Sequence, residues 1–195
     1  MKKIVIIAAA VLLCSAQAHA AVCGRPIPQG TWEFAGGSRL NYNHYEVEVN
    51  DDKVADYDTY GIHLDMAYYV VDNVAIGGFV SYQGNEYDPV GQGRTYTSDS
   101  TLVGPEIIWN FCAEERLWYP FNLYMKLGGG WADSDIGGND GSGWGLVFDA
   151  GIKFFLHKAC SLNLFYEYGY LDMDSDVTMS GSGVGIGLSI YNLNY

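Results

Sequence analysis

Residues 60–82 restrict the fold more than any other stretch, because apolar residues alternate there with small or polar ones. A period of two residues is the signature of a β-strand with two different faces. The stretch therefore predicts two strands joined by a tight turn at Val71-Asp72-Asn73. One face of this hairpin is almost purely apolar, with tyrosines near the strand ends. The other face carries small residues together with His63 and Asp65.

Six further segments show the same alternation, at residues 31–42, 101–111, 120–131, 144–155, 161–170 and 183–191. Strands of about ten residues have the length that a tilted strand needs to cross a bilayer. Polar segments at residues 43–56, 83–100, 132–143 and 171–182 are predicted to be long loops that alternate with short turns. The chain is therefore predicted to be all-β, an eight-stranded antiparallel up-and-down transmembrane β-barrel. Pro105 lies inside one of these strands, so a bulge is expected there.

Alternation alone leaves open which face points outward, since a water-soluble barrel alternates as well. The interior of an eight-stranded barrel is just wide enough for side chains to fill it. The apolar face carries so many aromatic rings that they would overfill this interior, so the apolar face is predicted to meet lipid. The rings also gather at the strand ends, as in the aromatic girdles of membrane interfaces. The predicted girdle residues are Tyr42, Tyr60, Tyr82, Trp131, Trp144 and Tyr170 at the loop end, and Trp32, Tyr68, Trp109, Phe121 and Phe154 at the turn end.

The first residues have the features of an export signal. Lys2 and Lys3 precede a short apolar run, and Ala18-His19-Ala20 is a small-x-small cleavage site. Residues 1–20 are therefore predicted to be a signal peptide, and residues 21–195 the outer-membrane barrel domain. The formal net charge of -13 argues against nucleic acid as a partner, because phosphate binding needs a basic surface.

The chain resembles the small eight-stranded outer-membrane barrels of the OmpA/OmpX type. The resemblance rests on the turn at residues 68–77, on Gly128-Gly129-Gly130-Trp131 at the end of a strand, and on the aromatic Tyr195. It implies the fold and a location in the outer membrane, and it specifies function poorly. Such barrels usually end on an outward-facing aromatic residue. Ile190 and Tyr195 have opposite parity here, so a bulge or a short tail is expected between them.

The inward face carries ionisable residues that must pair in a narrow lumen. The favoured interpretation is a polar plug that blocks solutes, and a proton or ion path or a hydrolase site stays open as an alternative. His63 and Asp65 stand two residues apart, but no catalytic motif accompanies them, so no enzyme activity, cofactor or metal is predicted. The plug residues are Glu33, Arg39, His63, Asp65, Glu106, Lys126, Asp149, Lys153 and Glu167.

The predicted loops carry most of the acidic residues. Asp172, Asp174 and Asp176 are spaced like the start of a calcium loop, but the glycine and glutamate of an EF-hand are missing. A looser role is predicted for them, as contacts to divalent cations that bridge to lipopolysaccharide phosphates. The alternative is a solvated acidic surface without a ligand.

Three cysteines remain after the predicted cleavage, namely Cys23, Cys112 and Cys160. All three map to the periplasmic rim of the predicted barrel, and an exported protein meets an oxidising compartment. A Cys112–Cys160 disulfide is the favoured pairing, and pairing of Cys23 with either of the others stays open.

Together these features predict a monomeric outer-membrane protein with a structural or surface-interaction role. Its partners would be outer-membrane lipid, lipopolysaccharide and a host or other surface ligand, reached through the loops. A channel for small solutes or hydrophobic compounds is the first alternative, and a lipid A-modifying enzyme is the second.

Overall fold

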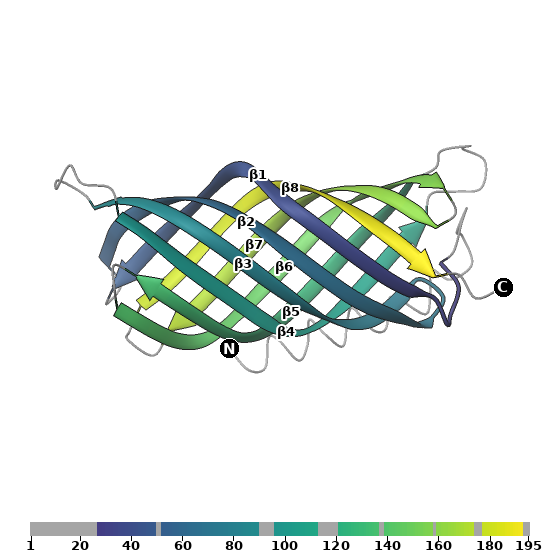
Figure 1. The fold of residues 1–195 in the computed structure, drawn as a ribbon, viewed down its shortest axis with the longest axis horizontal. Coiled ribbons are helices and arrows are strands. Elements are labelled where there is room, and N and C mark those ends of the chain that lie inside the picture. The colour runs from purple at the N-terminus through teal and green to yellow at the C-terminus, as the bar shows by residue number, and fades with distance from the viewer. Residues whose placement is uncertain are drawn as a thin grey trace.

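The computed structural model describes residues 27–49, 52–89, 96–112, 121–136, 139–157, 159–173 and 177–192. These residues form a closed barrel of eight antiparallel strands, each paired with its neighbours in sequence and the last paired with the first (Figure 1). The predicted fold is confirmed. No helix in the described part of the chain is long and apolar enough to cross a membrane. The strands are β1 (Trp32–Val49), β2 (Asp52–Val71), β3 (Val74–Pro89), β4 (Tyr96–Cys112), β5 (Phe121–Ile136), β6 (Asn139–His157), β7 (Cys160–Met173) and β8 (Val177–Asn192).

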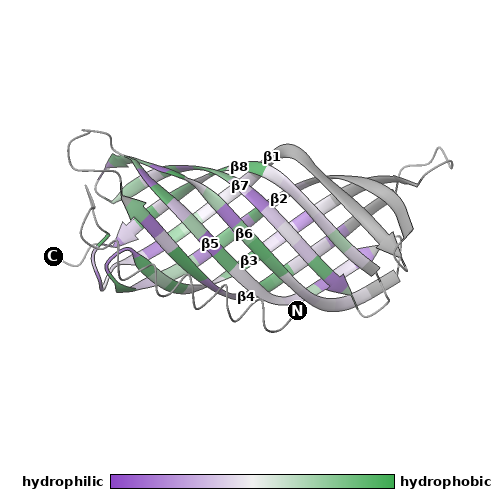
Figure 2. Cartoon of the chain, turned by 180° about the vertical axis from the view of Figure 1, so that it is seen from behind, coloured by the Kyte–Doolittle hydropathy of each residue, from purple (hydrophilic) through white to green (hydrophobic). Residues whose placement is uncertain are grey.

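The apolar face of each strand points away from the barrel, as the ring volume predicts. On β2, Leu64 is 62% exposed, whereas its neighbours His63 and Asp65 are buried in the lumen. Figure 2 shows the resulting alternation of hydrophobic and hydrophilic residues along the strands. Exposed large apolar side chains on this scale are unfavourable in water, so the outer surface is suited to lipid.

The two aromatic girdles have a spacing suited to a membrane. Tyr60 and Tyr68 lie eight residues apart on β2, which at a rise of ~3.3 Å per residue is about 26 Å along the strand. A strand tilt of about 40° reduces this to a height of about 20 Å, close to the apolar band of outer-membrane barrels. Rings contact one another at both levels: the Trp32 and Tyr68 centroids are 5.0 Å apart at the turn end, and those of Trp144 and Tyr170 are 5.6 Å apart at the loop end.

The four long loops were predicted wrongly, because most of their residues belong to strands. The ladders continue past the girdle, with Tyr45 opposite Tyr57, Tyr87 opposite Tyr96, and Ser134 opposite Gly141. Beyond the girdle the strands carry no apolar band for lipid, so the alternation that marks the lipid-facing strands ends there. Their backbone groups pair across strands, and a polar outer surface is compatible with water outside the membrane.

The predicted bulge at Pro105 is also wrong. The register between β4 and β5 is unchanged from Val103 opposite Trp131 to Glu106 opposite Gly128, and only Gly104 and Pro105 are missing from this ladder. The two strands approach closely here, because a Cβ atom at Gly104 would lie 2.1 Å from the carbonyl oxygen of Gly129. The register therefore continues past Pro105 without an extra residue, and the glycine at position 104 permits the close backbone approach.

A short segment before β1 closes the turn end of the lumen. The backbone N–H of Ile27 donates to Asn73 Oδ1 at 2.9 Å, and the N–H of Asn73 donates to the carbonyl of Ile27 at 2.9 Å. Gln29 N–H donates to Asp72 Oδ1 at 2.8 Å. Ile27 packs into the buried apolar cluster at this end, together with Tyr69, Ala75, Ile108, Tyr124, Phe165 and Tyr191.

Asn73 holds this closure through both its backbone and its side chain. It has a φ of 67°, a conformation that asparagine tolerates better than most residues. We expect Asn73→Ala to lower the free energy of unfolding by about 1–2 kcal/mol, because it removes a buried acceptor and leaves alanine at positive φ. Asn73→Gly is the matched control, since it relieves the backbone and loses only the side-chain bond. Urea unfolding in lipid vesicles measures both; equal stability of the alanine variant and the native protein would contradict the assignment.

Candidate functional site in the barrel lumen

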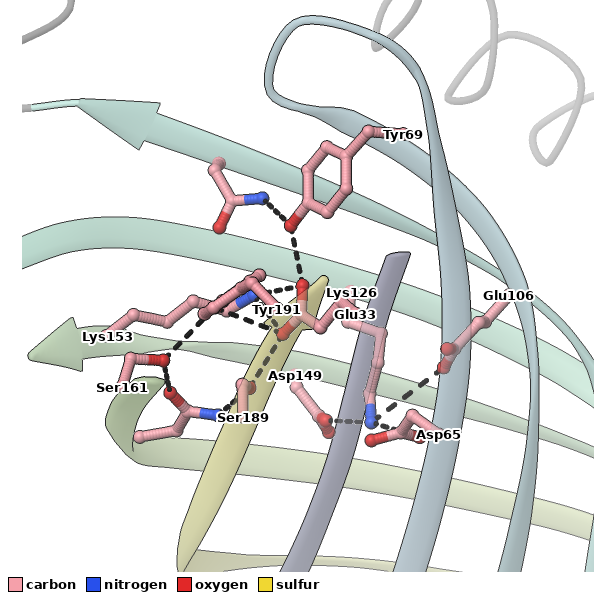
Figure 3. A network of polar contacts seen from close by, with 12 residues as sticks. Glu33, Asp65, Tyr69, Glu106, Lys126, Asp149, Lys153, Ser161, Ser189 and Tyr191 are labelled. Atoms are coloured by element: carbon pink, nitrogen blue, oxygen red, sulfur yellow. Dashed lines mark hydrogen bonds and ion pairs between the residues drawn. The ribbon is translucent and has the colours of Figure 1, made fainter. Parts of the chain in front are cut away.

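The first polar group of the lumen is centred on Glu33 and is called the Glu33 network (Figure 3). Lys153 Nζ donates to both Glu33 oxygens, at 2.6 and 2.8 Å. Tyr69 donates to Glu33 Oε2 at 2.5 Å, and Ser189 donates to Oε1 at 2.7 Å. Glu33 is 1% exposed, so this carboxylate is stabilised by the protein in place of water. The network consists of Glu33, Tyr69, Asn110, Lys153, Ser161, Asn163, Ser189 and Tyr191.

A second group surrounds Lys126 and is called the Lys126 cluster, made of Asp65, Glu106, Lys126 and Asp149 (Figure 3). The Lys126 ammonium lies 2.8 Å from Asp149 Oδ2 and 3.2 Å from Asp65 Oδ1. Glu106 Oε2 is further away, at 4.0 Å from the same nitrogen. Four different strands thus contribute one side chain each, and one lysine faces three carboxyl groups.

His63 lies beside this cluster. Its Nε2 is 3.3 Å from Asp65 Oδ2, and its Nδ1 is 4.0 Å from Glu167 Oε2. Its ring also packs on Phe165, with centroids 5.2 Å apart. Both ring nitrogens therefore face carboxyl groups, and the histidine is 7% exposed. This arrangement orients the imidazole within the lumen and keeps it away from solvent.

An apolar cluster fills the lumen toward the loop end, and sequence analysis did not identify it. Leu171 and Met173 extend from β7 and Met179 from β8, segments that were predicted to be loop. The alternation that places every second residue of β7 in the lumen continues through Leu171 and Met173. This continued alternation was the one sequence feature that indicated them. The cluster consists of Phe79, Leu102, Ala132, Val147, Leu171, Met173 and Met179.

The structure thus brings together eight of the nine predicted plug residues, namely Glu33, His63, Asp65, Glu106, Lys126, Asp149, Lys153 and Glu167, all of them buried. The ninth, Arg39, lies on β1 at the start of a register shift, and its side chain is outside the described part of the structure.

The remaining predicted sites fall mostly outside the described residues. Asp172 lies on β7 between Trp144 and Thr178, whereas Asp174 and Asp176 are not described. Among the described residues, no group of three or more histidine, cysteine or acidic side chains is arranged to hold a metal ion.

The cysteine pairing stays a prediction. Cys160 is a free thiol in the structure, while Cys23 and the side chain of Cys112 are not described. β4 and β7, which carry Cys112 and Cys160, are not neighbours in the barrel, whereas a disulfide usually needs Cα atoms closer than about 7 Å.

Comparisons with known proteins agree with this architecture. Residues 6–190 match the family model "Outer membrane protein beta-barrel domain". No curated protein matches the chain in sequence. Three solved structures share the fold: Neisserial surface protein A (TM-score 0.59, 13% identity, covering 83% of this chain and 99% of that one), OprG from Pseudomonas aeruginosa (TM-score 0.59, 12% identity, 86% and 98%), and Ail of Yersinia pestis in complex with the heparin analogue sucrose octasulfate (TM-score 0.50, 18% identity, 83% and 99%).

Proposed function

Because the chain belongs to the outer membrane protein beta-barrel domain family and resides in the outer membrane, we propose that it is a monomeric surface protein with a non-conducting lumen. The observation that carries this proposal is the burial of the side chains that face inward. Tyr69 and Asp149 are 0% exposed at different heights of the lumen. A water-filled pore would leave such residues accessible to solvent, as it does in the wider porins.

The burial of His63 supports the absence of enzyme activity. A general base must reach the proton that it abstracts from a substrate or a nucleophile. His63 instead faces Asp65 and Glu167 inside the closed barrel, with its ring nitrogens 3.3 and 4.0 Å from their carboxyl oxygens. Lipid and peptide substrates have no access to an imidazole in this position.

The strands that continue past the girdle supply the proposed interaction surface. Their register sets Glu46 opposite Asp56 and Asp56 opposite Asp88, and it also sets Asp99 opposite Asp135 and Asp135 opposite Asp140. Like charges directly opposite one another destabilise a sheet, so these rows favour cations nearby.

The negative charge of these acidic rows restricts the kind of ligand that the surface can bind. Ail binds a sulfated heparin analogue in its solved structure. A polyanion of that kind would be repelled by the acidic rows of this chain. We therefore propose that the rows take divalent cations and, through them, lipopolysaccharide phosphates on the membrane or a neighbouring surface.

Shortening the first hairpin tests the surface role. Tyr45 and Tyr57 are cross-strand partners, so replacing residues 46–56 with Asn-Gly keeps the register and forms a two-residue turn. We expect Mg²⁺-dependent binding of lipopolysaccharide micelles to weaken at least about tenfold, equivalent to ~1.4 kcal/mol.

The triple variant Glu46→Gln, Asp56→Asn, Asp88→Asn is the matched control of full length. It should lose binding as the shortened protein does, because the charge is the proposed determinant. Unchanged binding in both variants would contradict a role for this hairpin. Retained binding in the neutral variant alone would contradict the cation bridge.

A further inference from the structure

Glu106 is a buried carboxyl group whose environment does not suit a negative charge. It is 4% exposed, and neither of its oxygens has a hydrogen-bond partner among the described residues. An ionised carboxylate that is buried without hydrogen bonds is strongly unfavourable, because nothing replaces its hydration. By comparison, Glu33 accepts hydrogen bonds from Lys153, Tyr69 and Ser189.

The nearest cation, Lys126, is already engaged by two other carboxyl groups and does not compensate a negative charge on Glu106. Lys126 lies 2.8 Å from Asp149 and 3.2 Å from Asp65, so two carboxylates already balance its single charge. Glu106 is 4.0 Å from this nitrogen, beyond hydrogen-bonding distance. Figure 3 shows Lys126 between these three groups.

The wider lumen adds further negative charge. The described inward residues include five carboxyl groups, Glu33, Asp65, Glu106, Asp149 and Glu167, but only two lysines, Lys126 and Lys153, which leaves an excess of three. One of these lysines is engaged by Glu33. The other ionisable side chains buried in the lumen are Glu33 of β1, His63, Asp65 and Tyr69 of β2, Tyr124 and Lys126 of β5, Asp149 and Lys153 of β6, Glu167 of β7 and Tyr191 of β8.

We propose that the lumen holds a proton at neutral pH, carried by Glu106 and shared with Asp65. Both carboxyl groups approach the same Lys126 nitrogen, Asp65 Oδ1 at 3.2 Å and Glu106 Oε2 at 4.0 Å, so two acidic groups lie beside one ammonium. Two carboxylates this close do not both ionise readily, and one proton turns the repulsion into an O–H···O⁻ bond. Asp65 is the ionised partner, because it also accepts from Lys126 and faces His63.

A bound metal ion is the other way to balance the charge, and the geometry does not favour it. No set of three suitable ligands converges on one point in the described part of the lumen. A proton needs only the two facing oxygens. This proposal concerns the chemistry of the Lys126 cluster and does not depend on whether the protein binds a surface partner.

The proton links folding to pH. The folded barrel retains a proton that an exposed glutamate has released at neutral pH, so folding takes up one proton. The folding equilibrium constant is then expected to fall up to tenfold for each unit of rising pH, until Glu106 ionises in the folded state. The variant Glu106→Gln mimics the protonated side chain and should remove this dependence.

Infrared spectroscopy of the protein in lipid vesicles at pH 7 tests the proposal directly. We expect a band from a protonated carboxylic acid that shifts when glutamate is labelled with ¹³C and disappears in Glu106→Gln. Glu33→Gln is the matched control and should keep the band, because Glu33 is ionised and paired with Lys153. No band in the native protein, or an unchanged band in Glu106→Gln, would overturn the proposal.

Asp149→Asn adds a test that does not alter Glu106 itself. Removing this carboxylate leaves Lys126 with one fewer partner and able to pair with Glu106, so the acid band at pH 7 should shrink. An undiminished band in Asp149→Asn would contradict the proposed competition for Lys126. A band that follows the Na⁺ concentration at constant pH would show that a metal ion displaces the proton, which would overturn proton binding as the resting state.

Discussion

Replacing Lys153 with methionine is expected to lower the free energy of unfolding by about 3–5 kcal/mol. The substitution keeps the length of the side chain and removes its charge. Glu33 would then lose its cation and two hydrogen bonds of 2.6 and 2.8 Å, and it would have to stay charged without compensation or take up a proton. The lysine also lies 5.0 Å from the centre of the Tyr124 ring, a contact that methionine replaces only by packing. Urea unfolding in lipid vesicles, followed by tryptophan fluorescence, measures the change.

The double variant Lys153→Met, Glu33→Gln separates the charge from the packing. Without the carboxylate no unpaired charge remains, so part of the stability lost in the single variant should return. The difference between the single and double variants gives the coupling of the pair. A loss below about 1 kcal/mol in Lys153→Met would mean that water reaches Glu33, as at an exposed ion pair, which would contradict a filled lumen.

Leu64→Arg is expected to destabilise the barrel by about 2–4 kcal/mol, because it puts a charge on the lipid face near the middle of the membrane. Leu64 lies halfway between Tyr60 and Tyr68 on β2 and is largely exposed on the outer surface. The cost arises from the loss of hydration in the hydrocarbon region. It should be measured in the same vesicles as the Lys153 variants.

Tyr60→Arg is the matched control, on the same strand and the same face. At the level of the girdle an arginine reaches the headgroups, so the expected cost of its charge is only about 0–1 kcal/mol. The difference between the two positions therefore reports depth in the bilayer. Equal effects at Leu64 and Tyr60 would contradict the proposed position of the membrane.

The alternation of side chains was sufficient to predict the fold and the outward direction of the apolar face. On β2 the pattern is unbroken from Tyr60 to Tyr68, and a lipid-facing strand must show such a pattern. The segments beyond the girdle lack it, because water replaces lipid there and selects no apolar face. The bulge at Pro105 was predicted wrongly for a different reason. The register that sets Gly128, Gly129 and Gly130 of β5 beside this part of β4 could not be predicted from the sequence.

The members of the lumen site could be predicted, but their pairing could not. Lys153 and Glu33 are 120 residues apart and meet only because β8 closes onto β1 and the strands are staggered. The alternation along a strand shows which charged residues point into the lumen. Which of them pair depends on the strand register, because the register sets the height of each side chain in the barrel. The apolar cluster around Met173 and Met179 was missed because their strands were taken to end at the girdle.

The most direct test of the closed lumen is the conductance of the purified protein in a planar lipid bilayer, with an open porin as the positive control. Insertion is confirmed separately by the heat-dependent mobility of the folded protein on gels. Side chains from Ile27 at the turn end to Met179 at the loop end fill the lumen. The protein should therefore add no reproducible current steps to the bare bilayer. Regular steps from the inserted native protein would contradict the filled lumen and favour a channel.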